Sequence, residues 1–110
     1  MGSTKDIDSP TALAEYLIGL FPSFASEIEG EELTSYHQVF QRIAPVLSGY
    51  LKNSHPRTIK KFCALVNTMV DAAGDKENAI STCLLEHASQ VGVRKIIRPY
   101  LGPAAKRELG

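Results

Sequence analysis

The sequence has little cysteine, no long apolar run and no net charge, and each absence excludes a class of protein. Cys63 and Cys83 are its two cysteines, too few for a disulfide framework, and both lie within apolar helical patterns, as reduced core thiols do. No apolar run approaches the roughly 18 residues that cross a bilayer, and the first eight residues lack the apolar core of a secretory signal. We therefore expect a cytoplasmic protein with no membrane partner.

Catalytic motifs are also missing. The chain contains no G-x-S-x-G, no phosphate-binding G-x-x-x-x-G-K and no C-x-x-C or H-E-x-x-H metal spacing. One alternative is a zinc site, or a small enzyme, built from Cys63, Cys83 and His87, because Cys83 and His87 are four residues apart on one expected helix. All three belong to apolar stripes and no fourth ligand is evident, so we favour core packing and expect no enzyme activity, no metal and no cofactor.

What is present indicates one compact domain. The chain has 110 residues, of which 44% are hydrophobic and 22% charged, a composition typical of globular proteins rather than disordered ones. A chain of this length forms a single core. We expect a disordered N-terminal tail at 1–8, one helical domain at 9–103 and a polar C-terminal tail at 104–110, which has room for one more turn of helix.

The spacing of apolar residues is helical throughout. Ser9-Pro10 is a typical helix start, and Pro22 should end that first helix. Apolar residues recur at steps of three and four over 33–51, with Pro45 indicating a kink or a junction of two helices. The same spacing predicts helices over 56–73 and 75–91, with Gly74 and Gly92 as left-handed stops, and a short helix over 93–101 cut by Pro99.

No alternating pattern with hairpin turns occurs, so the predicted fold class is all-α, with about five to seven helices. Because short links join the helices, both a compact single-domain bundle and a set of stacked helical hairpins fit the sequence.

The zero net charge conceals a strong asymmetry along the chain. Residues 1–55 hold three basic and seven acidic side chains, whereas residues 56–110 hold nine basic and five acidic ones. The acidic cluster, in an expected connection between helices, consists of Glu27, Glu29, Glu31 and Glu32. The basic cluster near the C-terminus consists of Arg94, Lys95, Arg98, Lys106 and Arg107. An exposed acidic segment would attract a basic protein partner, and a basic cluster could contact phosphate.

Two segments carry a resemblance: Asn78 to Glu86, with sequence NAISTCLLE, and Ile97 to Pro103, with sequence IRPYLGP. In this C-terminal half the chain resembles small all-helical bacterial proteins of uncharacterised type, some of which are immunity proteins of toxin–immunity pairs, including contact-dependent growth inhibition systems. The resemblance implies an inhibitor without catalytic residues that occludes the active site of one cognate toxin. It implies no contact residues.

These observations lead to a main hypothesis and an alternative. The main one is a non-enzymatic immunity protein whose acidic cluster covers the basic active-site cleft of a cognate toxin, such as a nuclease. The alternative is a nucleic-acid-associated or regulatory helical module that uses the basic cluster. Nucleic acid is the less favoured partner, because the chain as a whole is not basic.

Overall fold

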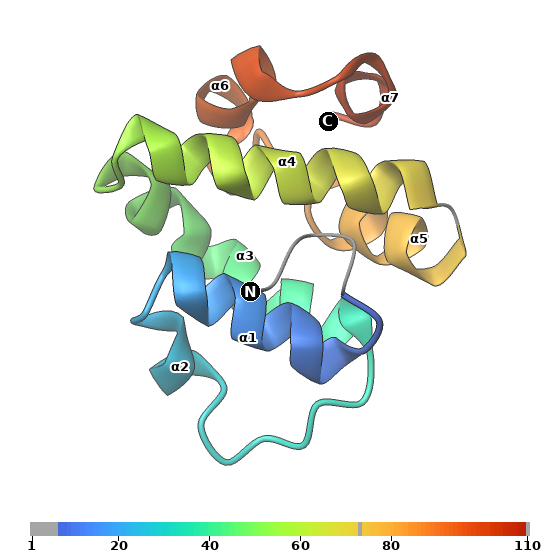
Figure 1. Ribbon diagram of the computed structural model, residues 1–110. Helices are drawn as coiled ribbons and strands as arrows, with labels where there is room; N and C mark the ends of the chain where they lie inside the picture. The colour runs from blue at the N-terminus through green and yellow to red at the C-terminus, as the bar shows by residue number, and fades with distance from the viewer. Residues whose placement is uncertain (1–6, 73, 110) are drawn as a thin grey trace.

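The computed structural model describes residues 7–72 and 74–109, and it is all-α over those residues (Figure 1). Its α-helices are α1 (Pro10–Leu20), α2 (Phe24–Glu27), α3 (Tyr36–Lys52), α4 (Pro56–Ala72), α5 (Gly74–Cys83), α6 (Arg94–Ile97) and α7 (Pro103–Arg107). Two 3₁₀ helices, η2 (Leu85–His87) and η3 (Arg98–Tyr100), lie among them. The predicted fold class is confirmed.

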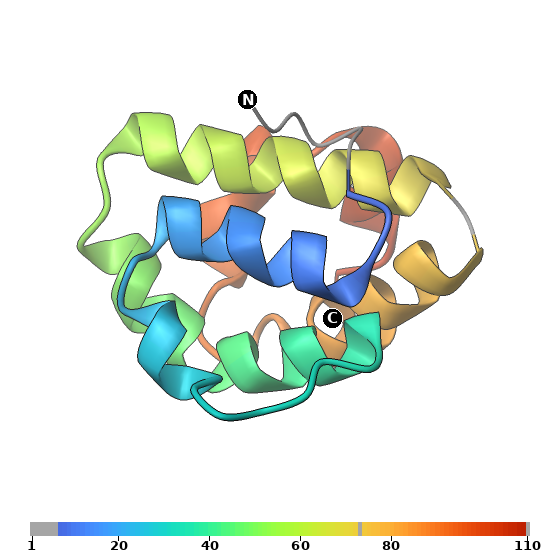
Figure 2. The ribbon, with the colours of Figure 1, turned by 60° about the horizontal axis from the view of Figure 1, so that its bottom comes forward.

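The long helix α4 lies between two groups of elements (Figure 1). One face of α4 contacts η3 and α7, and α1 and α5 also pack against it. Helix α3 in turn contacts α1, α2 and α5. Figure 2 shows α1, α3 and α4 enclosing a common interior, so the arrangement is a bundle with the C-terminal elements on one side of α4.

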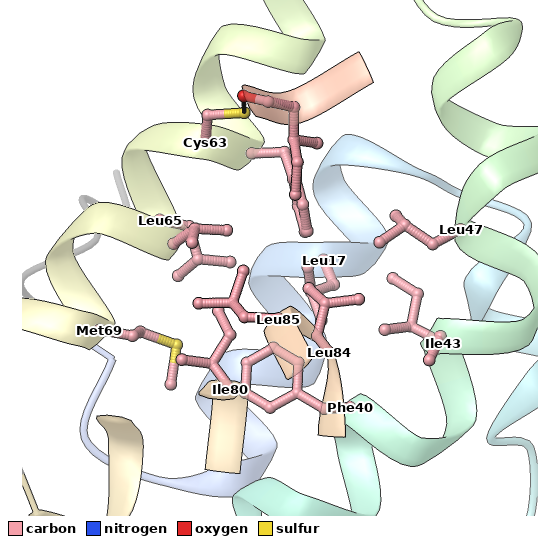
Figure 3. Close-up of a cluster of buried hydrophobic side chains, with 14 of the residues drawn as sticks. Leu17, Phe40, Ile43, Leu47, Cys63, Leu65, Met69, Ile80, Leu84 and Leu85 are labelled. Atoms are coloured by element: carbon pink, nitrogen blue, oxygen red, sulfur yellow. Dashed lines mark hydrogen bonds between the residues drawn. The ribbon is translucent and has the colours of Figure 1, made fainter. Parts of the chain in front are cut away.

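The core fills this interior with large aliphatic and aromatic side chains (Figure 3). Leu17 of α1, Phe40 of α3, Leu65 of α4 and Ile80 of α5 are all 0% exposed. At roughly 1.5–3 kcal/mol for each large apolar side chain removed from water, these contacts between helices hold the fold together. Leu65 is buried because α4 is covered on more than one side.

Several helix starts and stops lie where the sequence predicts them. The Ser9 hydroxyl caps α1 by accepting a hydrogen bond from the Ala12 amide at 3.1 Å, and α1 ends two residues before Pro22. Pro45 lies inside a single helix, α3, so the junction of two helices is not observed. Gly74 and Gly92 have φ angles of 69° and 79°, in the left-handed region predicted for them.

The single helix predicted over 75–91 is wrong. Helix α5 ends at Cys83, Leu84 leaves the helical region with φ −127° and ψ −61°, and η2 follows. The break turns the chain, so that Val93 and Ile97 reach the core at 0% exposure.

The ends of the chain differ from the predicted domain limits. The expected disordered tail at 1–8 falls mostly on residues outside the described part, but Ile7 is described and is buried. At the other end, α7 packs on α4 with Ala105 buried, and the Asn67 side chain accepts the Gly102 amide at 2.9 Å. The folded domain therefore continues beyond residue 103.

None of the helices in residues 7–72 and 74–109 combines the length and apolar character needed to cross a bilayer.

Candidate functional site

The acidic cluster lies on the loop that joins α2 to α3, at the end of the molecule opposite α6 and α7 (Figure 1). Glu27 ends α2, and the chain then runs through Gly30 (φ 78°) before α3 begins. Glu27, Glu29 and Glu32 are exposed, whereas Glu31 is partly buried. Three of the four predicted carboxylates are thus available to a partner.

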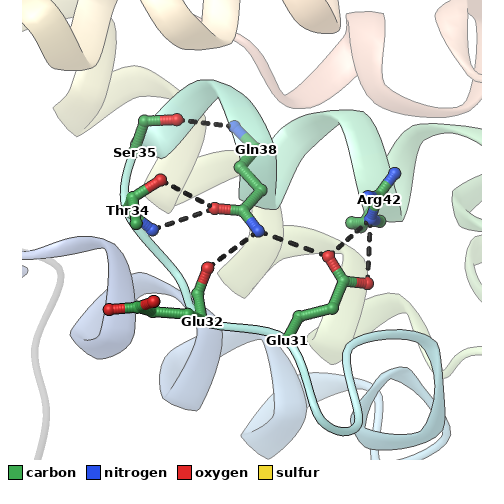
Figure 4. Close-up of polar contacts among 6 residues, drawn as sticks. All are labelled: Glu31, Glu32, Thr34, Ser35, Gln38 and Arg42. Carbon is green, nitrogen blue, oxygen red and sulfur yellow. Dashed lines mark hydrogen bonds and ion pairs between the residues drawn. The ribbon is translucent and has the colours of Figure 1, made fainter.

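Glu31 has an internal partner that the sequence analysis did not identify. Both of its carboxylate oxygens accept from Nε of Arg42 at 2.9 Å, and Nε2 of Gln38 donates to one of them at 3.3 Å (Figure 4). These hydrogen bonds, with that from Arg42 the largest effect, hold the pKa of Glu31 below the ordinary glutamate value. Glu31 therefore anchors the loop to α3.

The side chain of Gln38 holds the same loop by hydrogen bonds to the loop's backbone (Figure 4). Its side-chain oxygen accepts the Thr34 amide at 2.9 Å, and its side-chain nitrogen donates to the Glu32 carbonyl at 3.0 Å. Ser35 caps α3 by accepting the Gln38 amide at 3.1 Å. Ser35 and Gln38 have the spacing of a capping box, a sequence signal that places the start of α3 at Tyr36 rather than at residue 33.

The structure contains an open groove of about 610 Å³. It is lined by the α1–α2 link and α3, through Leu20, Phe21, Pro22, Ser23, Pro45, Val46, Gly49, Tyr50, Asn53 and Ser54. The rings of Phe21 and Tyr50 stack at 5.5 Å between centroids. Partial burial and, as a smaller effect, the charge of Glu27 raise the pKa of Tyr50 above the ordinary tyrosine value. The Glu27 carboxylate therefore lies near the groove.

The loop and the groove follow one stripe of α3. Arg42, which binds Glu31, is followed at helical spacing by Pro45 and Val46, and then by Gly49 and Asn53. The residue that anchors the loop and the lining of the groove thus lie along the same side of α3, and Glu27 lies near the groove. We call the groove together with Glu27, Glu29 and Glu32 the acidic face.

The basic cluster is exposed on the other side of the molecule. Arg94 and Lys95 lie on α6, Arg98 lies on η3, and Lys106 and Arg107 lie on α7. Both η3 and α7 pack on α4, so the tertiary structure gathers residues separated in sequence. The charge asymmetry of the sequence becomes a separation in space (Figures 1 and 2).

Cys63, Cys83 and His87 are not brought together. The buried Cys63 thiol donates to the Ile97 carbonyl at 3.7 Å (Figure 3), and exposed His87 hydrogen-bonds Gln90 at 2.9 Å. Cys83 instead lies beside His37, with 3.3 Å between Sγ and Nδ1 of the imidazole. Within the described ranges, no three His, Cys, Asp or Glu side chains are grouped as metal ligands would be.

The fold and these surfaces define a small all-α domain with two oppositely charged surfaces. The chain belongs to the family described as Domain of unknown function (DUF7674), whose model matches residues 14–109. No curated protein and no solved structure matches the chain.

Proposed function

We propose that this protein is a non-enzymatic, cytoplasmic immunity protein that binds a cognate toxin through the acidic face and covers the toxin's basic active site. The observation that carries the proposal is the group of three exposed carboxylates, one of which, Glu27, lies near an open groove on α3. The carboxylates would attract a basic cleft over long range, and the groove would receive apolar side chains of the partner. A nuclease, whose cleft binds phosphate, is the kind of toxin that this surface suits.

The anchoring of the loop supports this role. Association is weakened by the entropy lost when a mobile segment becomes ordered. Glu31, through Arg42, and Gln38, through two backbone contacts, already hold the loop against α3. The exposed carboxylates are therefore presented on an ordered backbone before a partner arrives.

The test begins with capture of a partner from lysate of the source cells on the immobilised protein. The variant Glu27→Lys/Glu29→Lys/Glu32→Lys is compared with a control, Asp71→Lys/Asp75→Lys/Glu86→Lys, which changes the net charge equally at exposed positions outside the acidic face. Association and dissociation rates of the captured protein are then measured at low and high salt, together with inhibition of its activity.

We expect the acidic-face variant to associate at least about tenfold more slowly at low salt, and the difference to shrink at high salt. Val46→Ser, in the groove, should mainly speed dissociation. The captured protein should lose its toxic activity in the wild-type complex. Equal association rates for the two charge variants, or a complex that remains active, would contradict the proposal.

The alternative is a nucleic-acid-associated or regulatory module. One observation favours it: the five cations of the basic cluster are exposed on neighbouring elements beside α4. Phosphate contacts release counterions, so binding to duplex or single-stranded nucleic acid should weaken steeply with salt. Replacing Arg94, Lys95 and Arg98 with Gln should then abolish binding; a flat titration of wild-type protein at low salt would eliminate this alternative.

A further inference from the structure

Three side chains from α3 and α5 form a cluster where these two helices pack. Nδ1 of His37 lies 3.3 Å from Sγ of Cys83, and Nε2 of the same ring lies 3.4 Å from Nδ2 of Asn78. The Thr82 hydroxyl donates to the Asn78 side-chain oxygen at 3.4 Å. Both nitrogens of the imidazole are thus engaged, one by a thiol and the other by an amide.

This arrangement contains the parts of an activated nucleophile. Such a nucleophile needs a base within hydrogen-bond reach and a third group that orients the base. Here the thiol is Cys83, the base is His37 and the orienting group is Asn78. The cluster lies at the surface, because Cys83 and His37 are partly exposed and Asn78 is exposed.

The base is needed because Cys83 does not ionise readily by itself. Burial raises the pKa of its thiol, and its position as the last residue of α5 puts it at the negative end of the helix dipole. Since the thiolate is the reactive form, a group that accepts the proton as the sulfur attacks speeds the reaction.

His37 accepts that proton at Nδ1 when its other proton is on Nε2. Rotation of the Asn78 amide by half a turn exchanges the places of its oxygen and nitrogen. The oxygen then accepts a hydrogen bond from Nε2 of His37, and the nitrogen donates one to the Thr82 hydroxyl, which can accept as well as donate. With the amide turned in this way, the hydrogen bond at Nε2 would leave the Nδ1 lone pair facing the thiol.

Cys63 provides an internal contrast. Its side chain is 1% exposed, its thiol donates to the Ile97 carbonyl, and burial raises its pKa to about 12. A polar reagent in solution reaches neither the sulfur nor its thiolate. The chemistry is therefore confined to one of the two cysteines.

The position of Cys83 also indicates the class of reaction. Acyl transfer needs donors that stabilise a negative oxygen, and the end of α5 presents carbonyl groups rather than amide donors. Attack on a disulfide places the developing charge on sulfur and requires no such donors.

We propose that Cys83 is a site of thiol–disulfide exchange with low-molecular-weight disulfides, with His37 accepting the thiol proton and Asn78 positioning the imidazole. The Cys83 sulfur attacks one sulfur of the disulfide R–S–S–R, and its proton passes to Nδ1 of His37. The new Cys83–S–S–R bond forms as the old S–S bond breaks, and the leaving thiolate takes the proton as R–SH. Cys83 is oxidised, the released thiol is reduced, and a free thiol reverses the step.

The experiment measures this exchange on the full chain at neutral pH, with an aromatic disulfide as the optical probe and glutathione disulfide as the natural one. Intact mass and peptide mapping identify the modified residue. The variants are Cys83→Ser, Cys63→Ala and His37→Ala, with exposed His87→Ala as the matched histidine control. Far-ultraviolet circular dichroism checks the folding of each variant. The preference of the disulfide for Cys63 or Cys83 is measured on the wild-type protein, which carries both thiols.

We expect one equivalent of disulfide to react, at Cys83, with little change in Cys63→Ala or His87→Ala and no reaction in folded Cys83→Ser. His37→Ala should slow the exchange at least about tenfold, since general bases contribute roughly 100-fold or more in enzymes. Added imidazole should restore much of that rate, which a merely structural histidine would not allow. Comparable reaction of Cys63 in folded wild-type protein, or exchange in His37→Ala as fast as wild type, would overturn the proposal.

Discussion

At the scale of single residues, Glu31 is distinguished from the other acidic residues of its loop by its partners. It accepts hydrogen bonds from Arg42 and Gln38, whereas Glu27, Glu29 and Glu32 are exposed. One carboxylate of the predicted set is therefore structural, and the remaining three form the part that a partner can reach. The contact with Arg42 spans 11 positions along the chain, and nothing in the local sequence marks it.

This difference predicts how the loop responds to acid. The pKa of Glu31 is lowered, chiefly by the hydrogen bond from Arg42, so its pairing stabilises the fold at neutral pH. That stabilisation is lost as the pH falls from the ordinary glutamate pKa through the lowered one. A titration followed by carbon NMR should show Glu31 ionising below the ordinary glutamate pKa, and Arg42→Ala should raise the pKa of Glu31. A Glu31 pKa at the ordinary glutamate value, left unchanged by Arg42→Ala, would contradict the assignment.

At the scale of elements, the break after α5 is a packing feature. Cys83 ends the helix and is partly exposed, but the next two residues, Leu84 and Leu85, are both 0% exposed. The turn through η2 then leads the chain to Val93, which is buried as well. The break therefore joins the α3–α5 side of the core to the segment that covers α4.

Shortening Leu84 tests this role. We expect Leu84→Ala to lower the free energy of unfolding by about 2–5 kcal/mol, since it removes a fully buried side chain and leaves a cavity. Lys95→Ala, at an exposed position on α6, is the control and should change stability by less than about 0.5 kcal/mol. Urea unfolding followed by circular dichroism measures both; equal effects would show that Leu84 is not a core residue.

At the scale of the whole molecule, the fold places the two charge clusters on opposite sides. The acidic loop follows α2, the basic cluster lies on α6, η3 and α7, and the bundle separates them (Figures 1 and 2). Zero formal net charge therefore coexists with a molecular dipole. A basic partner and an anionic one would be attracted to different ends of the same protein.

The C-terminal elements also belong to the folded unit. Deleting 103–110 removes α7 and uncovers the part of α4 against which buried Ala105 packs. We expect the deletion to lower the free energy of unfolding by about 1 kcal/mol or more, because each buried methyl-sized group contributes roughly 0.8 kcal/mol. Replacing Lys106 and Arg107 with Gln in the full chain is the control for lost charge. Unchanged thermal stability of the truncated protein would instead support a tail without a structural role.

The helical class, many of the helix ends and the charge asymmetry along the chain follow from local sequence. These features depend on neighbouring residues: the Ser9 cap, the stop at Pro22 and the left-handed Gly74 and Gly92 each act within a turn or two of the chain. The apolar spacing of α3 and α4 likewise predicts a buried face, whatever packs against it.

Which side chains meet depends instead on how the helices pack. His37 and Cys83 lie 46 positions apart, and Asn67 reaches Gly102 across 35. The break at Leu84, the burial of Ala105 and the groove beside Tyr50 likewise depend on how whole helices pack. Periodicity specifies that a helix has an apolar face, but the partner of that face is selected by the packing of the entire core, and the polar side chains at its edge are paired as a consequence.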